Sequence, residues 1–289
     1  MLQQLEQMRK RAVLYYLLLI PAVLLSVILI FLIAPLGVLC LIAGVSVLLS
    51  LGSKAHKKYV RAFKKLIVED SFQKSFDKVR YVPGRGLSRK VIEETGMIYT
   101  GNRYSSDDYV SGSYKGVSFV RSDVCIQNVQ RTGKTTVTVT YFNGKWMIFD
   151  FNKRFVNDLQ VLERGFRYSR KTGGLFSGKP RMHKLETEDA AFNRAFRVNA
   201  VSDHEAFYIL TPHFMESLRR ISAKINGELL LCFIDSYLHI AVNTGSNALE
   251  APMFTKINPD TAFGSTRREI ALIRHLVDEL KLNNNIFKG

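Results

Sequence analysis

Cysteine is scarce in this sequence, and its placement excludes two classes of protein. The 289 residues include three cysteines, Cys40, Cys125 and Cys232, and no two of them are spaced as Cys-x-x-Cys. A disulfide framework or a cysteine-bound zinc site needs cysteines at short, regular spacing. We therefore expect buried, reduced thiols.

Motifs for catalysis and cofactor binding are also missing. The six histidines show no His-Glu-x-x-His spacing, and no Gly-x-Ser-x-Gly or glycine-rich dinucleotide fingerprint occurs. Gly133-Lys134-Thr135 is similar to the end of a phosphate-binding loop, but Asn128 stands where that motif needs its first glycine. The sequence thus predicts no catalytic residue, no cofactor and no metal, which favours a protein that is not an enzyme.

Charge is absent from residues 13–51, which form one apolar tract broken only at Ala34-Pro35-Leu36-Gly37. A spanning helix needs about 20 apolar residues. Residues 13–33 meet that length, and residues 36–51 reach it by borrowing neighbours or tilting. The tract therefore predicts two transmembrane helices joined by a very short outer loop.

Two other interpretations compete with a hairpin. A secretory signal peptide has a shorter apolar core followed by a small-residue cleavage site, which this sequence lacks. A single bent re-entrant helix remains an alternative. Basic residues flank the tract on both sides, so the positive-inside rule predicts that both ends lie in the cytoplasm.

The formal net charge is +16, and the basic excess is densest beside the tract. Residues 1–80 carry 12 Lys and Arg against 4 Asp and Glu, an excess of 8, and residues 81–289 carry 29 against 21, also an excess of 8. Anionic lipid attracts juxtamembrane Lys and Arg. Because this explains the charge and no nucleic-acid-binding motif appears, we do not expect nucleic acid as a partner.

The period of the apolar residues changes along the rest of the chain. Residues 53–80 follow helical spacing, with a slip in phase between Ile67 and Phe72. Alternating residues then predict antiparallel strands at 109–114, 117–130, 134–142 and 145–151. Hairpin turns are predicted at Arg131-Thr132-Gly133-Lys134 and Asn143-Gly144. Residues 87–96 are expected to form a short helix, with Ser88 as a candidate N-cap. Helices and strands mix in the second half, where Ser202 and Thr211 are expected helix caps.

These patterns predict an α+β fold: an N-terminal two-helix transmembrane hairpin, then a cytosolic domain with an antiparallel β-meander and a helix-strand second half. The predicted parts are a hairpin at 1–52, a basic helical stalk at 53–96, a β-rich subdomain at 97–164, a basic loop at 165–185 and an α+β subdomain at 186–289.

The stretch 165–185 is the best candidate for a binding surface, because it contains no acidic residue and four glycines. An unstructured stretch longer than about 12–15 residues is often functional. Basic residues of the stalk could act with it on an anionic surface. The candidates are Arg167, Arg170, Lys171, Lys179, Arg181, Lys184, Lys57, Lys58, Lys64 and Lys65.

Several stretches resemble an uncharacterised bacterial membrane-protein family, domain of unknown function thirty-one thirty-seven. They are Ser106-Asp107-Asp108-Tyr109-Val110-Ser111-Gly112, Tyr141-Phe142-Asn143-Gly144-Lys145-Trp146, residues 149–153, Phe192-Asn193-Arg194-Ala195-Phe196-Arg197-Val198, and residues 206–212. The resemblance extends over nearly the whole chain. It implies a two-span protein of the bacterial cytoplasmic (inner) membrane with both termini and its main domain in the cytoplasm, sometimes encoded near LemA-type proteins. It implies no active-site residue.

Three functions follow as hypotheses. The leading one is a membrane-anchored cytosolic interaction module that binds a membrane-protein partner or the anionic surface of the lipid bilayer, with a homo-oligomer as an open alternative. The second is a sensor of a small ligand or lipid headgroup. The third, a membrane-bound hydrolase, requires His204 or His239 to meet Asp235 or Glu228 in a pocket.

Overall fold

The computed structural model describes residues 1–150, 155–169 and 180–282. The chain divides into two compact units. We call Met1–Lys74 with Leu249–Arg268 the anchor unit, and Ser75–Ala248 with Glu269–Gly289 the sheet unit. The α+β class is confirmed: long apolar helices are followed by an antiparallel sheet and a C-terminal helix.

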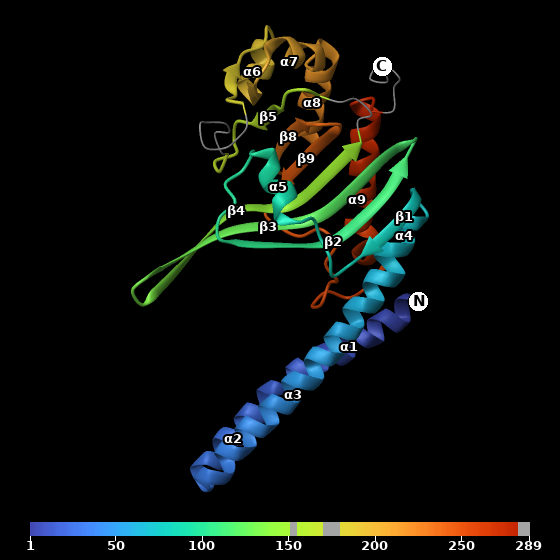
Figure 1. The fold of residues 1–289 in the computed structure, drawn as a ribbon. Coiled ribbons are helices and arrows are strands. Elements are labelled where there is room, and N and C mark those ends of the chain that lie inside the picture. The colour runs from blue at the N-terminus through green and yellow to red at the C-terminus, as the bar shows by residue number, and fades with distance from the viewer. Residues whose placement is uncertain (151–154, 170–179, 283–289) are drawn as a thin grey trace. The chain divides into compact units, whose positions relative to one another are not determined.

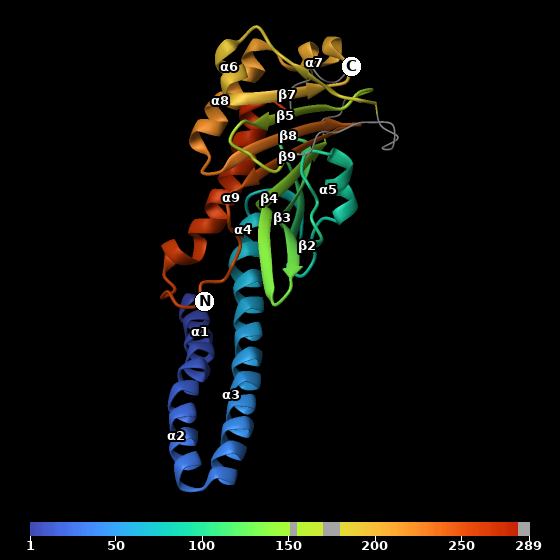
Figure 2. The same cartoon turned by 90° about the vertical axis from the view of Figure 1, so that its left-hand side faces the viewer.

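The anchor unit is a helical hairpin. Helices α1 (Leu2–Leu17) and α2 (Leu19–Leu32) run one after the other and lie antiparallel beside α3 (Ala34–Phe63), as Figure 2 shows. The chain reverses at Ile33, and Pro35 sits in the first turn of α3, where a missing N–H costs no helical bond. Gly37 lies against α2, since a Cβ there would meet the Ile30 nitrogen at 2.3 Å.

Two helical stretches, Leu2–Leu32 and Ala34–Gln73, are long and apolar enough to cross a membrane by length and composition. Only 6% of the most apolar window of each is buried within the protein. Leu24 and Phe31, for example, are 60% and 87% exposed. Side chains of this kind are compatible with a lipid bilayer around the hairpin.

The slip in helical phase after Ile67 has a structural cause. A π-helical turn, η1 (Lys64–Glu69), joins α3 to α4 (Asp70–Gln73). A π turn inserts one residue into the helical repeat and so rotates the apolar stripe. The prediction of helix as far as residue 80 was wrong, because strand β1 begins at Asp77.

The sheet unit is built on one nine-stranded antiparallel sheet, in the order β1-β2-β3-β4-β9-β8-β5-β7-β6. The strands are β1 (Asp77–Val82), β2 (Arg103–Tyr114), β3 (Val117–Thr132), β4 (Thr135–Asp150), β5 (Leu159–Glu163), β6 (His183–Leu185), β7 (Phe196–Ala200), β8 (Glu228–Ile234) and β9 (Tyr237–Asn243). The sheet takes strands from both halves of the predicted cytosolic domain. The division of the chain into five parts stays a prediction.

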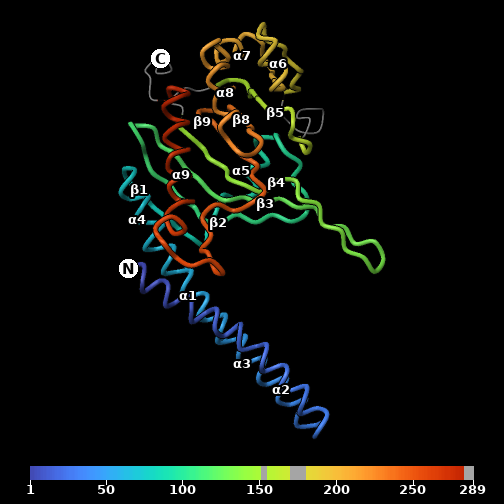
Figure 3. Tube along the Cα trace, turned by 180° about the vertical axis from the view of Figure 1, so that it is seen from behind, coloured from blue at the N-terminus to red at the C-terminus, as the bar shows by residue number. Residues whose placement is uncertain are grey.

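Strand β4 corrects one predicted turn. The β3–β4 hairpin turns at Gly133-Lys134, within the predicted stretch 131–134, because β3 continues to Thr132. The tip of this hairpin extends beyond the rest of the sheet (Figures 1 and 3). Asn143-Gly144 makes no turn and lies inside the continuous strand β4. Gly144 is needed there because a Cβ would meet the Val242 carbonyl oxygen of β9 at 2.0 Å.

Helices cover both faces of the sheet, as Figure 2 shows. Helix α5 (Arg89–Thr95) packs on the face that carries Val124, Trp146 and Cys232. The opposite face meets α8 (Pro212–Lys224) and the end of α9 (Pro259–Glu279). Phe214 of α8 contacts Phe233 there, with ring centroids 5.9 Å apart.

The helix starts confirm the local predictions. Ser88, Ser202 and Thr211 each accept a backbone N–H bond at the start of α5, α7 (Asp203–Ile209) and α8. The side chain of Asp189 caps α6 (Ala190–Ala195). These contacts lie within one turn, so sequence alone contains the whole interaction.

Candidate functional site

Basic side chains form a stripe on the helix that leaves the apolar tract. Lys57 and Lys58 are exposed on α3, and Lys65 is exposed on η1, while Lys64 is half-buried. The opposite face is apolar, with Tyr59 buried in the anchor unit. The stripe is thus available to an anionic partner along the part of the helix nearest the tract.

The predicted basic loop is only partly described. Arg167, Arg181 and Lys184 are exposed, and Lys184 lies in the short edge strand β6. Its Nζ is 2.5 Å from Glu186 Oε1, so part of its charge is already paired. Arg170, Lys171 and Lys179 lie outside the described residues.

A clamp holds residues 249–268 to the base of the hairpin. Arg9 of α1 donates from Nη1 to the Met253 carbonyl oxygen (2.8 Å), and its other nitrogens bind the Glu6 carboxylate (2.7 and 2.9 Å). Tyr59 of α3 donates its hydroxyl to the Pro252 carbonyl oxygen (2.7 Å). Sequence reasoning missed this clamp because Arg9 and Met253 are 244 positions apart and no local pattern links them.

The sheet unit contains a buried ion network. The Arg121 guanidinium, with no exposed side-chain surface, lies 2.6 Å from Asp123 Oδ1 and 3.0 Å from Glu269 Oε2 of α9. Lys145 also binds Glu269. Burial raises the pKa of the Asp123 carboxyl although Arg121 opposes that shift. The network joins strands β3 and β4 to α9.

Three carboxylates gather at the edge of this network. One oxygen of each of Asp107, Asp108 and Asp123 lies within 4.8 Å of the others. Asp108 accepts a hydrogen bond from the Tyr81 hydroxyl (2.5 Å), and desolvation beside that carboxylate raises the tyrosine pKa. Arg121 and Tyr81 thus supply internal partners for this cluster, and we assign no metal to it.

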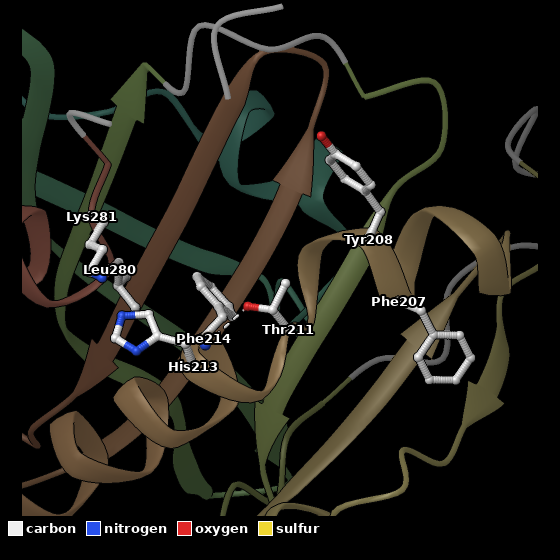
Figure 4. Close-up of a pocket in the computed structure, with 7 residues that line it drawn as sticks. All are labelled: Phe207, Tyr208, Thr211, His213, Phe214, Leu280 and Lys281. Atoms are coloured by element: carbon white, nitrogen blue, oxygen red, sulfur yellow. Dashed lines mark hydrogen bonds between the residues drawn. The ribbon is translucent and has the colours of Figure 1, made fainter. Parts of the chain in front are cut away.

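An apolar pocket of about 550 Å³ lies among α7, α8 and the two residues that follow α9. Its lining residues are Phe207, Tyr208, Thr211, His213, Phe214, Leu280 and Lys281. Figure 4 shows His213 beside Leu280 and Lys281 at one end, with Tyr208 and Phe207 at the other. A mostly apolar and aromatic lining with a few polar groups is typical of a small-molecule site.

The residues named for a hydrolase lie in different surroundings. His204 is exposed on α7. The buried His239 accepts the Trp146 indole N–H at Nδ1 (3.2 Å), and Glu228 accepts a bond from Asn243 (2.8 Å). Asp235 lines a second pocket of about 420 Å³, whose described lining includes no histidine. These contacts give His239 and Glu228 structural roles.

Comparison with known proteins gives one family. Residues 140–282 match the model of a family described as protein of unknown function (DUF3137). That region contains the resembling stretches from Tyr141 onward, whereas residues 106–112 and the hairpin lie outside it. A comparison with curated proteins found no match.

Among solved structures, the chain is similar to the crystal structure of the mycobacterial trehalose monomycolate transport factor A, TtfA. The TM-score is 0.36 and the sequence identity 11%, over 74% of this chain and 94% of that chain. Similarity this weak leaves the function to be argued from the residues themselves.

Proposed function

We propose that this chain, whose residues 140–282 match the DUF3137 family of unknown function, is a membrane-anchored interaction module of the bacterial inner membrane. Its sheet unit would face the cytoplasm and bind a membrane-protein partner or the anionic membrane surface. The observation that carries the proposal is the hairpin: two long apolar helices without a charged side chain from residue 13 to 51, flanked on both sides by basic residues.

The flanking charge supports the orientation. An even number of spans places both ends on one side, and Lys and Arg favour the cytoplasmic side. Each basic side chain close to an anionic leaflet contributes about 1 kcal/mol, and the attraction fades within a Debye length of about 8 Å. The exposed Lys57 and Lys58 follow the tract by only a few residues and would lie within reach.

The test is site-specific photo-cross-linking of the full chain in native membranes. The cross-linker replaces Lys57, Lys58, Arg167 or Lys184, and, as a matched control, the exposed Lys134 at the hairpin tip. A single membrane protein recovered in stoichiometric amount from the first four positions supports a protein partner, and cross-linked anionic lipid supports the membrane surface. Products no different from those of the control position would refute both forms of the proposal.

A second candidate function, a sensor of a small ligand or lipid headgroup, is favoured by the apolar pocket of the sheet unit. Phe214, 4% exposed, forms part of its wall, and Lys281 offers a positive charge at one end. Native mass spectrometry of the purified full chain tests this function. We expect a bound amphiphile that is lost when Leu280→Trp fills the pocket and retained when the exposed Tyr237 is changed to Trp. An unliganded wild-type protein would count against it.

A further inference from the structure

The clamp of the anchor unit also fixes where residues 251–257 lie along the hairpin. Pro252 and Met253 are held through their carbonyl oxygens by Tyr59 and Arg9. The Ile257 N–H, at the other end of the segment, donates to Glu6 Oε2 (3.0 Å). Both ends of this loop are therefore attached to the helices, and Ile257 itself is buried.

The rise per residue of the helix shows how deep these contacts would lie in a bilayer. Residues 13–33 extend over about 31 Å at about 1.5 Å per residue, which matches a hydrocarbon core of about 30 Å. Arg9 precedes Val13 by four residues, or about 6 Å. The headgroup layer adds about 5–7 Å on each side of the core. If the hairpin spans the bilayer, Arg9 and the Met253 carbonyl bound to it lie in the headgroup layer.

The tip of the loop has the composition of a membrane-interface anchor. Phe254 directly follows Met253 and is 86% exposed, almost as much as Phe31 inside the apolar tract at 87%. Lys256, two residues later, is exposed as well. An aromatic ring is favoured at the boundary between headgroups and acyl chains, and a lysine beside it pairs with anionic headgroups.

We propose that the 251–257 loop is a third membrane contact of this protein, in which Phe254 enters the headgroup layer and Lys256 contacts anionic lipid. The inference rests on the proposed membrane anchoring. The loop would join the base of the hairpin to the leaflet at a point far in sequence from both spans. Arg9 acts in it as the residue that sets the depth of the loop.

Tryptophan emission in vesicles tests the depth directly. The natural Trp146 is fully buried in the sheet unit and gives a constant background. Full chains carrying Phe254→Trp, Leu24→Trp or Lys65→Trp are reconstituted into phosphatidylcholine–phosphatidylglycerol vesicles with brominated acyl chains. Lys65 is the matched control, because it is exposed in the same unit but lies six residues, or about 9 Å, farther from the tract than Tyr59, which binds Pro252 of the loop.

We expect quenching to fall in the order Leu24→Trp, Phe254→Trp, Lys65→Trp, with blue-shifted emission for the first two. Quenching of Phe254→Trp no stronger than that of Lys65→Trp, while Leu24→Trp is quenched, would overturn the loop contact alone. An unquenched Leu24→Trp would overturn the anchor and the loop contact with it.

A second change tests the role of Arg9. Arg9→Gln in the Phe254→Trp chain removes the charged donor to Met253, so quenching of the indole introduced in the loop should weaken. The control is Arg61→Gln, at an exposed arginine of α3 in the same unit, which should leave quenching unchanged. Equal quenching in the Arg9→Gln and Arg61→Gln chains would refute Arg9 as the residue that sets the depth.

Discussion

Replacing Arg121 by methionine tests whether the buried ion network holds the sheet unit together. Methionine keeps much of the side-chain volume but leaves the carboxylates of Asp123 and Glu269 without their guanidinium. Both residues are almost fully buried, at 1% and 2% exposed. Lys145 still binds Glu269, so Asp123 is the carboxylate that loses its counterion. Removing one partner of a buried ion pair costs about 3–5 kcal/mol, because a buried charge is left without solvent or counterion.

The loss of stability can be measured as a fall in the melting temperature, Tm. For a unit of this size, each kcal/mol shifts Tm by about 2–4 °C, so Arg121→Met should lower Tm by about 6–20 °C. The fluorescence of Trp146, the single tryptophan of the chain, reports unfolding of the sheet unit in the full-length protein. Arg220→Met is the control, since Arg220 pairs with Glu216 and Glu279 at the surface, where a pair contributes about 1 kcal/mol or less.

The loss of stability caused by Arg121→Met should also depend on pH. Burial already raises the pKa of Asp123, and removing Arg121 takes away the opposing positive charge and raises the folded-state pKa of that carboxyl further. An acid whose folded pKa lies above its unfolded pKa stabilises the fold at low pH and loses that contribution as pH rises through the folded value. The Tm difference between Arg121→Met and wild type should therefore be larger at neutral pH than at acidic pH. A shift no larger than that of Arg220→Met, or one independent of pH, would refute the reasoning.

Three further changes test other parts of the sheet unit. Gly144→Ala should destabilise the sheet unit by about 1–3 kcal/mol in urea unfolding, because the added Cβ collides with β9. Gly84→Ala is the control and should be nearly neutral, because the space around its Cβ is open. Equal unfolding midpoints for the two variants would contradict the close approach of Gly144 to β9. Tyr81→Phe removes the hydroxyl that donates to the buried Asp108 and should lower the free energy of unfolding by about 1–3 kcal/mol in the same urea experiment. An unchanged midpoint would show that this hydrogen bond does not contribute to stability. Phe214→Ala should lower the free energy of unfolding by about 3–5 kcal/mol, since this ring is 4% exposed. A loss of less than about 1 kcal/mol by calorimetry would show that the pocket wall collapses to fill the space.

The features that sequence predicted correctly are the local ones. Helix caps at Ser88, Ser202 and Thr211 involve residues within one turn. The slip in phase near Ile67 was visible because a π turn changes the spacing of neighbouring apolar residues. The hairpin tip at Gly133 was recognisable because the turn needs a positive φ, which is +59° there.

The features that sequence missed depend on distant partners. Gly144 looked like a turn residue, but its neighbour is the Val242 carbonyl oxygen of β9. Asp107 and Asp108 precede the predicted strand 109–114, but they lie in β2, where Asp107 pairs with Asp123 of β3. Glu269 joins the same network from a helix 148 positions from Arg121. The alternation and spacing of apolar residues describe only the strand or helix in which they occur. Neither the order of the strands in the sheet nor these distant contacts could therefore be predicted from them.

The discontinuity of the anchor unit has a consequence for how the protein is made. The hairpin leaves the ribosome before residues 249–268, since Tyr59 and Pro252, which bond in the finished clamp, are 193 residues apart. At about 5–20 residues per second, synthesis of that interval takes about 10–40 s. Throughout this time both helices of the hairpin have been synthesised, whereas Met253 and Pro252, whose carbonyl oxygens bind Arg9 and Tyr59, have not. Insertion of the hairpin and closure of its base are therefore separate events, and nearly all of the sheet unit is synthesised between them.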